Sequence, residues 1–185
     1  MTTFPEDNLS LEAPDPQDDV IQLSPIGCTC AVMRIDGSQD GEDQAGRAIV
    51  HALEAAGHEV AEYVRVPPDI VAVNGRLKRW LEDADIVAVC IAGEADWVRG
   101  DLAAQTLERM IQRKIEGFGE LVRLLAWERL GSAAMRCRAL AGYVDSTLVF
   151  VVPDEPTLAQ AAAEKLIAPE LAGLVSVAGA EQEAV

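Results

Sequence analysis

Short apolar runs alternate along this chain with segments in which apolar residues recur at helical spacing. The runs at 30–35, 60–66, 86–91 and 147–152 predict four β-strands. The third run is apolar at every position, so we expect that strand to lie at the centre of a sheet and to be covered on both faces. Alternating strands and helices are typical of βα units, and the pattern therefore predicts a three-layer α/β sandwich with a mostly parallel sheet.

Five helical segments are predicted around these strands. The first starts at Gln44 and ends at Gly57, a residue type typical of helix C-termini. The second follows Pro67-Pro68-Asp69, where Asp69 is expected to cap the helix. The others start at Asp101, cover 118–129, and run from Pro156 to a stop before Pro169. In such sandwiches ligands bind outside the carboxyl ends of the strands, so the loops after the strands are the ones to inspect.

The two ends of the chain lack this pattern. Residues 1–27 are expected to form a disordered acidic arm, because the first 26 residues hold six acids and no lysine or arginine. Its few apolar residues could instead dock on a protein partner. Residues 28–172 are expected to form the folded domain, and residues 173–185 a tail without regular structure.

Charge narrows the classes of partner. Thirty-one acidic and fifteen basic residues give a net charge of −16, which disfavours nucleic acid and anionic membranes as partners. The chain has no apolar run long enough to span a membrane and no basic-then-apolar start typical of a signal peptide, so we expect a cytoplasmic protein. Its four cysteines are then expected to be free thiols, although Cys28 and Cys30 could also form half of a metal site.

Several short motifs occur in a fixed order. The longest run, 115–142, holds a GFGE tetrapeptide, a following helix, the turn Gly131-Ser132 and an Arg-Ala-x-Ala-Gly sequence that begins at Arg138. Asp43-x-x-Gly46, the sequence EAAGHEV and Pro68-Asp69 precede it. Together these motifs resemble the molybdenum cofactor biosynthesis proteins of the MoaB/Mog type, over residues 29–172.

The resemblance implies an α/β fold, a homotrimer, and a site that binds the phosphate of molybdopterin and transfers an adenylyl group from ATP to it with Mg²⁺. By position, Asp69 and Asp101 would be the catalytic acids that hold metal and nucleotide phosphates, a role suited to Mg²⁺. Each could equally be a helix N-cap. Glu120 could cap a helix or contact a neighbouring subunit. The implied ligand-binding positions are Asp43, Gly46, Gly93, Glu120, Ser132 and Arg138.

The sequence departs from this family at its phosphate-binding loops. A TGGTG-like loop is replaced by residues 92–96, AGEAD, and a PGSP-like turn by residues 153–156, PDEP. Glycine suits such loops because the backbone must approach the anion closely. A carboxylate about 4 Å from a phosphate costs on the order of 4 kcal/mol at an effective dielectric of 20, and about 1 kcal/mol in water. The altered positions are Glu94, Ala95, Asp96, Cys137, Asp154 and Glu155.

Three functions therefore compete. The first is a divergent family member, a pseudoenzyme with a structural or regulatory role, whose phosphate site is degraded. The second is a working molybdopterin adenylyltransferase, or another phosphate-ester enzyme, whose extra carboxylates hold a second divalent cation. The third is a sensor of a cationic or neutral small molecule. The new acids could also point into water, but the glycine amides of the phosphate site would still be missing, so the anion site would be lost in that case too.

Overall fold

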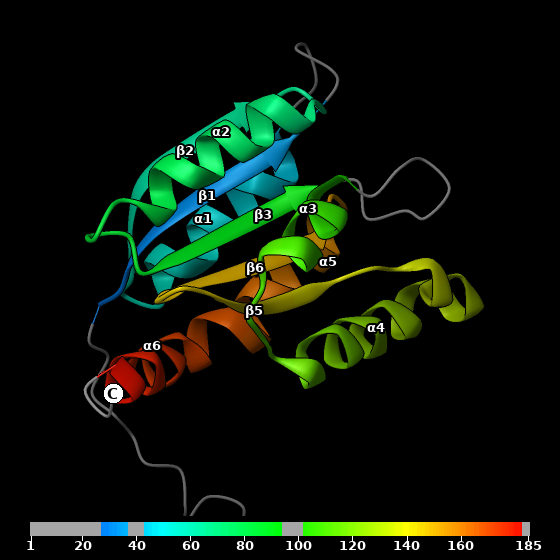
Figure 1. Ribbon diagram of the computed structural model, residues 1–185. Coiled ribbons are helices and arrows are strands. Elements are labelled where there is room, and N and C mark those ends of the chain that lie inside the picture. Colours follow the sequence, from blue (N-terminus) through cyan, green and yellow to red (C-terminus); the bar gives the residue numbers. More distant parts are fainter. Residues whose placement is uncertain (1–26, 37–42, 94–101, 183–185) are drawn as a thin grey trace, which may run out of the picture.

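The protein is described from a computed structural model over residues 27–36, 43–93 and 102–182 (Figure 1). Strands and helices alternate through most of the chain. The strands are β1 Thr29–Ile35, β2 Glu59–Val66, β3 Ala88–Gly93, β4 Arg113–Lys114, β5 Leu140–Val144 and β6 Thr147–Pro153. The α-helices are α1 Gln44–Ala55, α2 Ile70–Leu81, α3 Leu102–Met110, α4 Glu116–Leu130, α5 Pro156–Ala162 and α6 Ala168–Gln182. A 3₁₀ turn, Gly131–Arg136, follows α4, and a π-helical turn, Ala163–Ile167, joins α5 to α6.

The six strands form one sheet in the order β2-β1-β3-β6-β5-β4. The first four are parallel, whereas β5 pairs antiparallel with β6 and β4 antiparallel with β5. The predicted three-layer sandwich with a mostly parallel sheet is confirmed. Register pairs Arg34 with Ala92 and Gly93 with Pro153, so the carboxyl ends of β1, β3 and β6 meet at one edge of the sheet.

Helices cover both faces of this sheet (Figure 1). Side chains of α1, α4, α5 and α6 pack on one face against Val32, Cys90 and Phe150. Side chains of α2 and α3, among them Trp80 and Leu107, pack on the other face. Every residue of β3 is buried, as predicted for a central strand. No helix within the described ranges is long and apolar enough to cross a membrane.

The C-terminal part of the chain corrects two predictions. The helix that starts at Pro156 does not stop before Pro169, because the π-helical turn leads into α6 and Pro169 lies in the first turn of α6. Pro169 has no N–H to donate, and the π-helical turn just before it shifts the bonding pattern, with the Ala168 N–H donating to the Ala163 carbonyl. The tail predicted to begin at residue 173 is instead helical as far as Gln182, with Ala178 packed against the sheet.

A buried histidine ties this last helix to the first strand. Nδ1 of His58 accepts a hydrogen bond from the Cys28 N–H at 3.3 Å, and its Nε2 lies 3.0 Å from the carbonyl oxygen of Ala168. The acceptor role of Nδ1 places the ring proton on Nε2, which donates to Ala168. His58 is 6% exposed, so its ring serves the packing of three distant segments.

Candidate functional site

Charged side chains gather at the edge where the parallel strands end. Arg34, near the end of β1, binds the carboxylate that directly follows β6: its Nε donates to Oδ1 of Asp154 at 2.9 Å and its Nη2 to Oδ2 at 3.1 Å. β3 lies between these two strands, but its Ala92, in register with Arg34, has too short a side chain to separate them. The backbone N–H of Asp154 donates to the Gly93 carbonyl at 2.9 Å, which fixes the position of the acid.

Two further carboxylates approach the same guanidinium. Nη1 of Arg34 lies 3.2 Å from Oδ2 of Asp36 and 3.4 Å from Oδ1 of Asp43. Asp36 also pairs with Arg65 of β2. We call these five residues, Arg34, Asp36, Asp43, Arg65 and Asp154, the strand-end cluster.

The positive charges of the strand-end cluster are paired with carboxylates of the same cluster. Three carboxylates face two guanidinium groups, and the side chain of Arg34 is only 11% exposed. Hydrogen bonds to Asp154 are the main cause that raises the pKa of Arg34 above its ordinary value. The charge of Arg34 is therefore balanced by carboxylates of the chain, while its Nη1 takes part in ion pairs without a hydrogen bond.

The Asp43-x-x-Gly46 motif lies beside this cluster. Asp43 caps α1 by accepting the N–H of Gly46 at 3.1 Å. A Cβ on Gly46 would lie 2.6 Å from the hydroxyl oxygen of Tyr63, so glycine lets this ring pack against the start of the helix. Oδ2 of Asp43 and the Tyr63 hydroxyl are both buried and have no hydrogen-bond partner within the described part of the chain. Nη1 of Arg34 is a third buried atom at this edge without a hydrogen-bond partner in the described chain, although Asp36 and Asp43 lie within ion-pair distance of it. These three atoms are the polar groups at this edge that a ligand or a water molecule could still engage.

Gly93 has a packing role at the end of β3. A Cβ at this position would lie 2.9 Å from the Cβ of Ala103, so glycine lets α3 pack closely on the strand. Its φ lies outside the left-handed region, so glycine is needed here for close packing and not for an unusual backbone conformation. The altered positions Glu94, Ala95 and Asp96 lie outside the described residues.

The acids of the second altered loop are both engaged. Asp154 binds Arg34, and Glu155 caps α5. The carboxylate of Glu155 accepts the N–H groups of Thr157 at 3.3 Å and Leu158 at 2.6 Å, and also the Thr157 hydroxyl at 3.0 Å. The predicted repulsion of a phosphate by these two acids is therefore reduced, because one is neutralised and the other is held at a helix N-terminus.

Asp69, the first predicted catalytic acid, is the N-cap of α2. Its Oδ1 accepts the N–H groups of Val71 at 3.0 Å and Ala72 at 2.9 Å, and the residue is exposed. Asp101 lies outside the described residues, so the predicted pairing of the two acids around a metal has no geometry here. Among the described residues, no group of three His, Cys, Asp or Glu side chains is placed to hold a metal ion.

The other predicted positions lie along α4 and the segment that leads to β5. Glu120 and Ser132 are exposed. Arg138 forms an ion pair with Glu108 of α3, with 2.7 Å between Nη2 and Oε1. Cys137 is partly buried, and burial raises the pKa of its thiol to about 11. The ion pair of Arg138 with Glu108 joins this segment to α3 and not to the strand-end cluster.

Four residues of this edge were not among the predicted site residues: Arg34, Asp36, Arg65 and Tyr63. A signal for Arg34 was present, since it is the one charged residue within the apolar run 30–35. A charge inside an otherwise buried strand is rarely tolerated without a partner. That partner, Asp154, lies 120 residues away, and only the register of β1, β3 and β6 brings it close.

Comparison with known proteins places this geometry in a family. Residues 26–173 match the model of the probable molybdopterin binding domain. The chain is 30% identical over 142 residues to the molybdenum cofactor biosynthesis protein B of Escherichia coli K12, covering 76% of this chain and 84% of that protein. It is 34% identical over 149 residues to the protein of the same name from Staphylococcus aureus strain COL, covering 78% and 88%. A crystal structure of a molybdenum cofactor biosynthesis protein B superposes with a TM-score of 0.76 at 26% identity, covering 83% of this chain and 97% of that one.

Proposed function

The chain belongs to the molybdopterin-binding-domain family and is a MoaB/Mog-type molybdenum cofactor biosynthesis protein, and from this premise we propose that it is a divergent member with little or no adenylyl transfer activity. In this role it would bind molybdopterin weakly and act as a structural or regulatory homologue in cofactor assembly. Its family ligands would be molybdopterin and ATP, with Mg²⁺ as the accompanying ion.

The internal pairing of Arg34 with Asp154 carries this proposal. A phosphate that approached the carboxyl ends of β1, β3 and β6 would meet three carboxylates, and the nearest guanidinium is already bound to all three. Release of Arg34 toward the phosphate would leave Asp154 without its partner at a position where the side chain is only 17% exposed. Both alternatives cost free energy, because like charges repel strongly where water is largely excluded.

Calorimetric titration of the full chain with molybdopterin and with its adenylylated form tests this proposal. We expect no binding tighter than about 100 μM, and no adenylyl transfer above background with ATP and Mg²⁺. An active adenylyltransferase of the same family, titrated in parallel, shows that the ligand is intact. Micromolar binding together with turnover would contradict the proposal.

An active Mg²⁺-dependent adenylyltransferase is the second candidate, and the arrangement at Asp69 favours it. Both capping hydrogen bonds fall on Oδ1 of this exposed carboxylate, which keeps Oδ2 available as a metal ligand. Asp69 and Asp101 would hold the ion together with substrate phosphates, and Glu94 and Asp96 would add a second cation. Asp69→Asn is the matched variant, because asparagine also caps helices but carries no charge. This candidate requires Mn²⁺ or Mg²⁺ binding at millimolar concentration that the variant weakens at least tenfold.

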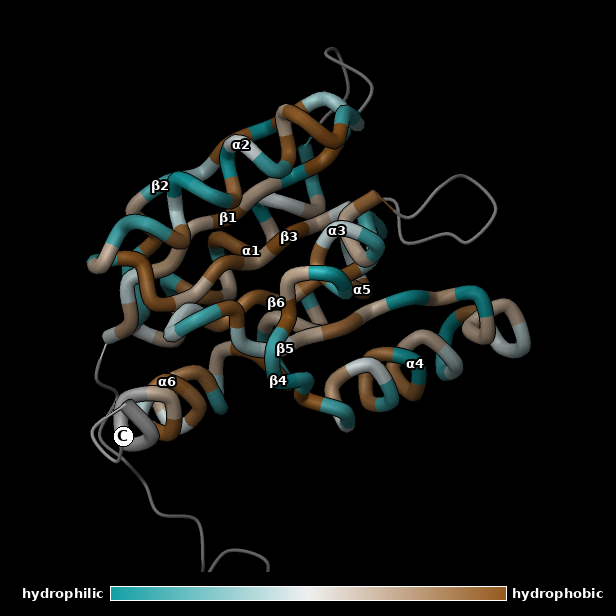
Figure 2. Tube along the Cα trace, viewed as in Figure 1, coloured by the Kyte–Doolittle hydropathy of each residue, from teal (hydrophilic) through white to brown (hydrophobic). Residues whose placement is uncertain are grey.

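Assembly as a homotrimer is part of the same proposal. Four large apolar side chains of α4 are 47–58% exposed, and they form an apolar ridge of Leu121, Leu124, Trp127 and Leu130. Figure 2 shows hydrophobic positions on this helix, which lies at the side of the molecule. Exposed apolar patches of this kind are typical of protein contacts. Sedimentation should give the trimer mass for the full chain and a smaller mass for Leu124→Glu, whereas Val177→Glu on α6 should leave the trimer intact.

A further inference from the structure

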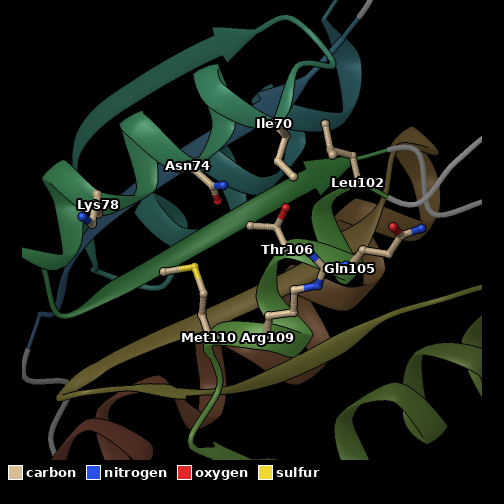
Figure 3. Close-up of a pocket in the computed structure, with 8 residues that line it drawn as sticks. All are labelled: Ile70, Asn74, Lys78, Leu102, Gln105, Thr106, Arg109 and Met110. Atoms are coloured by element: carbon tan, nitrogen blue, oxygen red, sulfur yellow. The ribbon is translucent and has the colours of Figure 1, made fainter.

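A groove separates α2 and α3 on the face of the sheet opposite to α1 and α5. Its volume is about 420 Å³, within the range of small-molecule sites. Figure 3 shows Ile70, Asn74 and Lys78 of α2 facing Thr106, Arg109 and Met110 of α3 across it. The groove runs along the two helices, and Lys78 lies eight residues beyond Ile70, about 12 Å along the axis of α2.

The charge of this groove is opposite to that of the protein. Both of its ionisable side chains, Lys78 and Arg109, are cations, although the chain carries a net charge of −16. Within the described ranges, neither of them has an acidic partner within 4.0 Å. The adjacent acid of α3, Glu108, is already paired with Arg138. Among the described residues, no acid of the chain neutralises these two positive charges in a concave surface, which suits them to bind an anion.

Thr106 supplies an unused hydrogen-bond donor beside these cations. The residue is 6% exposed, and its hydroxyl oxygen has no hydrogen-bond partner in the described structure. A buried threonine in a helix usually donates to the carbonyl one turn earlier, and buried hydroxyl groups without a partner are uncommon. In Figure 3 this oxygen lies on the side of the helix that faces α2. A ligand oxygen that reached the floor of the groove would complete the bonding of Thr106.

We propose that the groove between α2 and α3 binds a small organic anion. Ile70 and Met110 would contact its carbon skeleton, Lys78 and Arg109 would bind its carboxylate or phosphate, and the Thr106 hydroxyl would donate to one of its oxygens. The strand-end cluster contributes no residue to this groove. The inference goes beyond the proposed function, and either one can fail while the other stands.

Calorimetric titration of the full chain with four probes tests which chemistry the groove recognises. The probes are 1-naphthyl phosphate, 1-naphthoate, 1-naphthol and inorganic phosphate, each at low salt. We expect at least one of the two aromatic anions, 1-naphthyl phosphate or 1-naphthoate, to bind at least tenfold more tightly than both the neutral naphthol and inorganic phosphate. The aromatic anion that binds more tightly shows whether the groove prefers a phosphate or a carboxylate. Equal binding of naphthol, or no binding of either aromatic anion at 5 mM, would overturn the proposal.

Variants locate the binding in the groove. Lys78→Gln combined with Arg109→Gln should weaken the binding of the aromatic anion at least tenfold. The control pair Arg129→Gln and Lys165→Gln removes the same charge from exposed positions of other helices and should change the binding less than twofold. Equal losses in the two double variants would show a general charge effect and would overturn the site.

Thr106→Val separates ligand binding from stability. Valine has nearly the same shape but no unsatisfied hydroxyl, so the free protein should melt about 2 to 4 °C higher. Binding of the aromatic anion should nevertheless weaken at least threefold. Loss of binding by unfolding would lower the melting temperature instead, and unchanged binding in a stabilised variant would remove Thr106 from the site.

Discussion

Nε of Arg34 lies 2.9 Å from Oδ1 of Asp154, although the two residues are 120 positions apart in the chain. Because β3 holds β1 and β6 in register between them, the guanidinium and the carboxylate meet above the end of the central strand. Asp154, an acid in a loop where the family has glycine, therefore helps to hold the folded structure together by binding Arg34. Under the proposed function, the stability of the domain and its affinity for molybdopterin depend on the same side chains.

Loss of the cation should destabilise the domain. Arg34→Met leaves three carboxylates facing one another with only Arg65 to balance them, and removal of one partner from a largely buried pair typically costs about 3 to 5 kcal/mol. Urea unfolding at pH 7 measures this difference from the wild type. Arg129→Met on the exposed part of α4 should stay within about 0.5 kcal/mol of the wild type.

Reversion of the second altered loop toward the family sequence should restore affinity for a phosphate ester. Asp154→Gly together with Glu155→Ser removes both carboxylates of this loop and frees Arg34 from Asp154 so that it can bind a phosphate, which we expect to strengthen molybdopterin binding at least tenfold. Glu155→Ser alone should have little effect, because serine also caps helices. Calorimetry on both variants checks the prediction. An unchanged affinity in the double variant would show that Asp154 is not what weakens the site.

The two glycines of the GFGE tetrapeptide should differ sharply. Both lie inside α4. A Cβ on Gly119 would lie 2.5 Å from the carbonyl oxygen of Ala139, whereas a Cβ on Gly117 would meet nothing within 4 Å. Gly119→Ala should therefore lower the free energy of unfolding by about 1 to 3 kcal/mol through overpacking. Gly117→Ala should leave it unchanged or raise it by up to about 1 kcal/mol, because alanine favours helix. Thermal unfolding of both variants measures this difference. Equal losses of stability would mean that both glycines are needed for the backbone conformation and not only Gly119 for packing.

Stability should fall at alkaline pH partly through Cys137. Burial raises the pKa of this thiol from 9.0 to about 11, while the charge of Arg123 opposes the shift. As the pH rises, the Cys137 thiol of the unfolded chain loses its proton before the thiol of the folded protein does. The free energy of unfolding is therefore unaffected by this thiol below pH 9 and falls as the pH rises from 9 to 11. Urea unfolding of the wild type and of Cys137→Ala across this range should show a shallower decline for the variant. Parallel curves would mean that the thiol ionises equally readily in the folded protein.

The sequence pattern predicted the structure correctly where the residues that determine an element lie within that element. The run 86–91 is apolar at every position, and the corresponding β3 is the buried strand between β1 and β6. Asp69 was expected at a helix start and caps α2. In both cases the residues that determine the structure are neighbours in the chain, so periodicity and capping preferences suffice.

Prediction failed where the decisive partner is distant or the signal is short. β4 has two residues, and β5 contains Ala141 and Gly142, so neither shows the alternation of a strand. Gly142 is needed because a Cβ would lie 2.5 Å from the carbonyl oxygen of Arg113, a contact that exists only after the strands have paired. Asp154 was likewise interpreted as a ligand-facing acid, because nothing near it in the sequence indicates Arg34.

The hydrogen bonds of His58 affect the order in which this domain folds during its synthesis. The imidazole needs Cys28, which directly precedes β1, and Ala168 at the start of α6, so its hydrogen bonds span nearly the whole described domain. During synthesis the amino-terminal half emerges first and can pair β1 with β2 early. The histidine ring then has only one of its two hydrogen bonds until α6 has left the ribosome and docked, so the core is completed only after α6 has been synthesised.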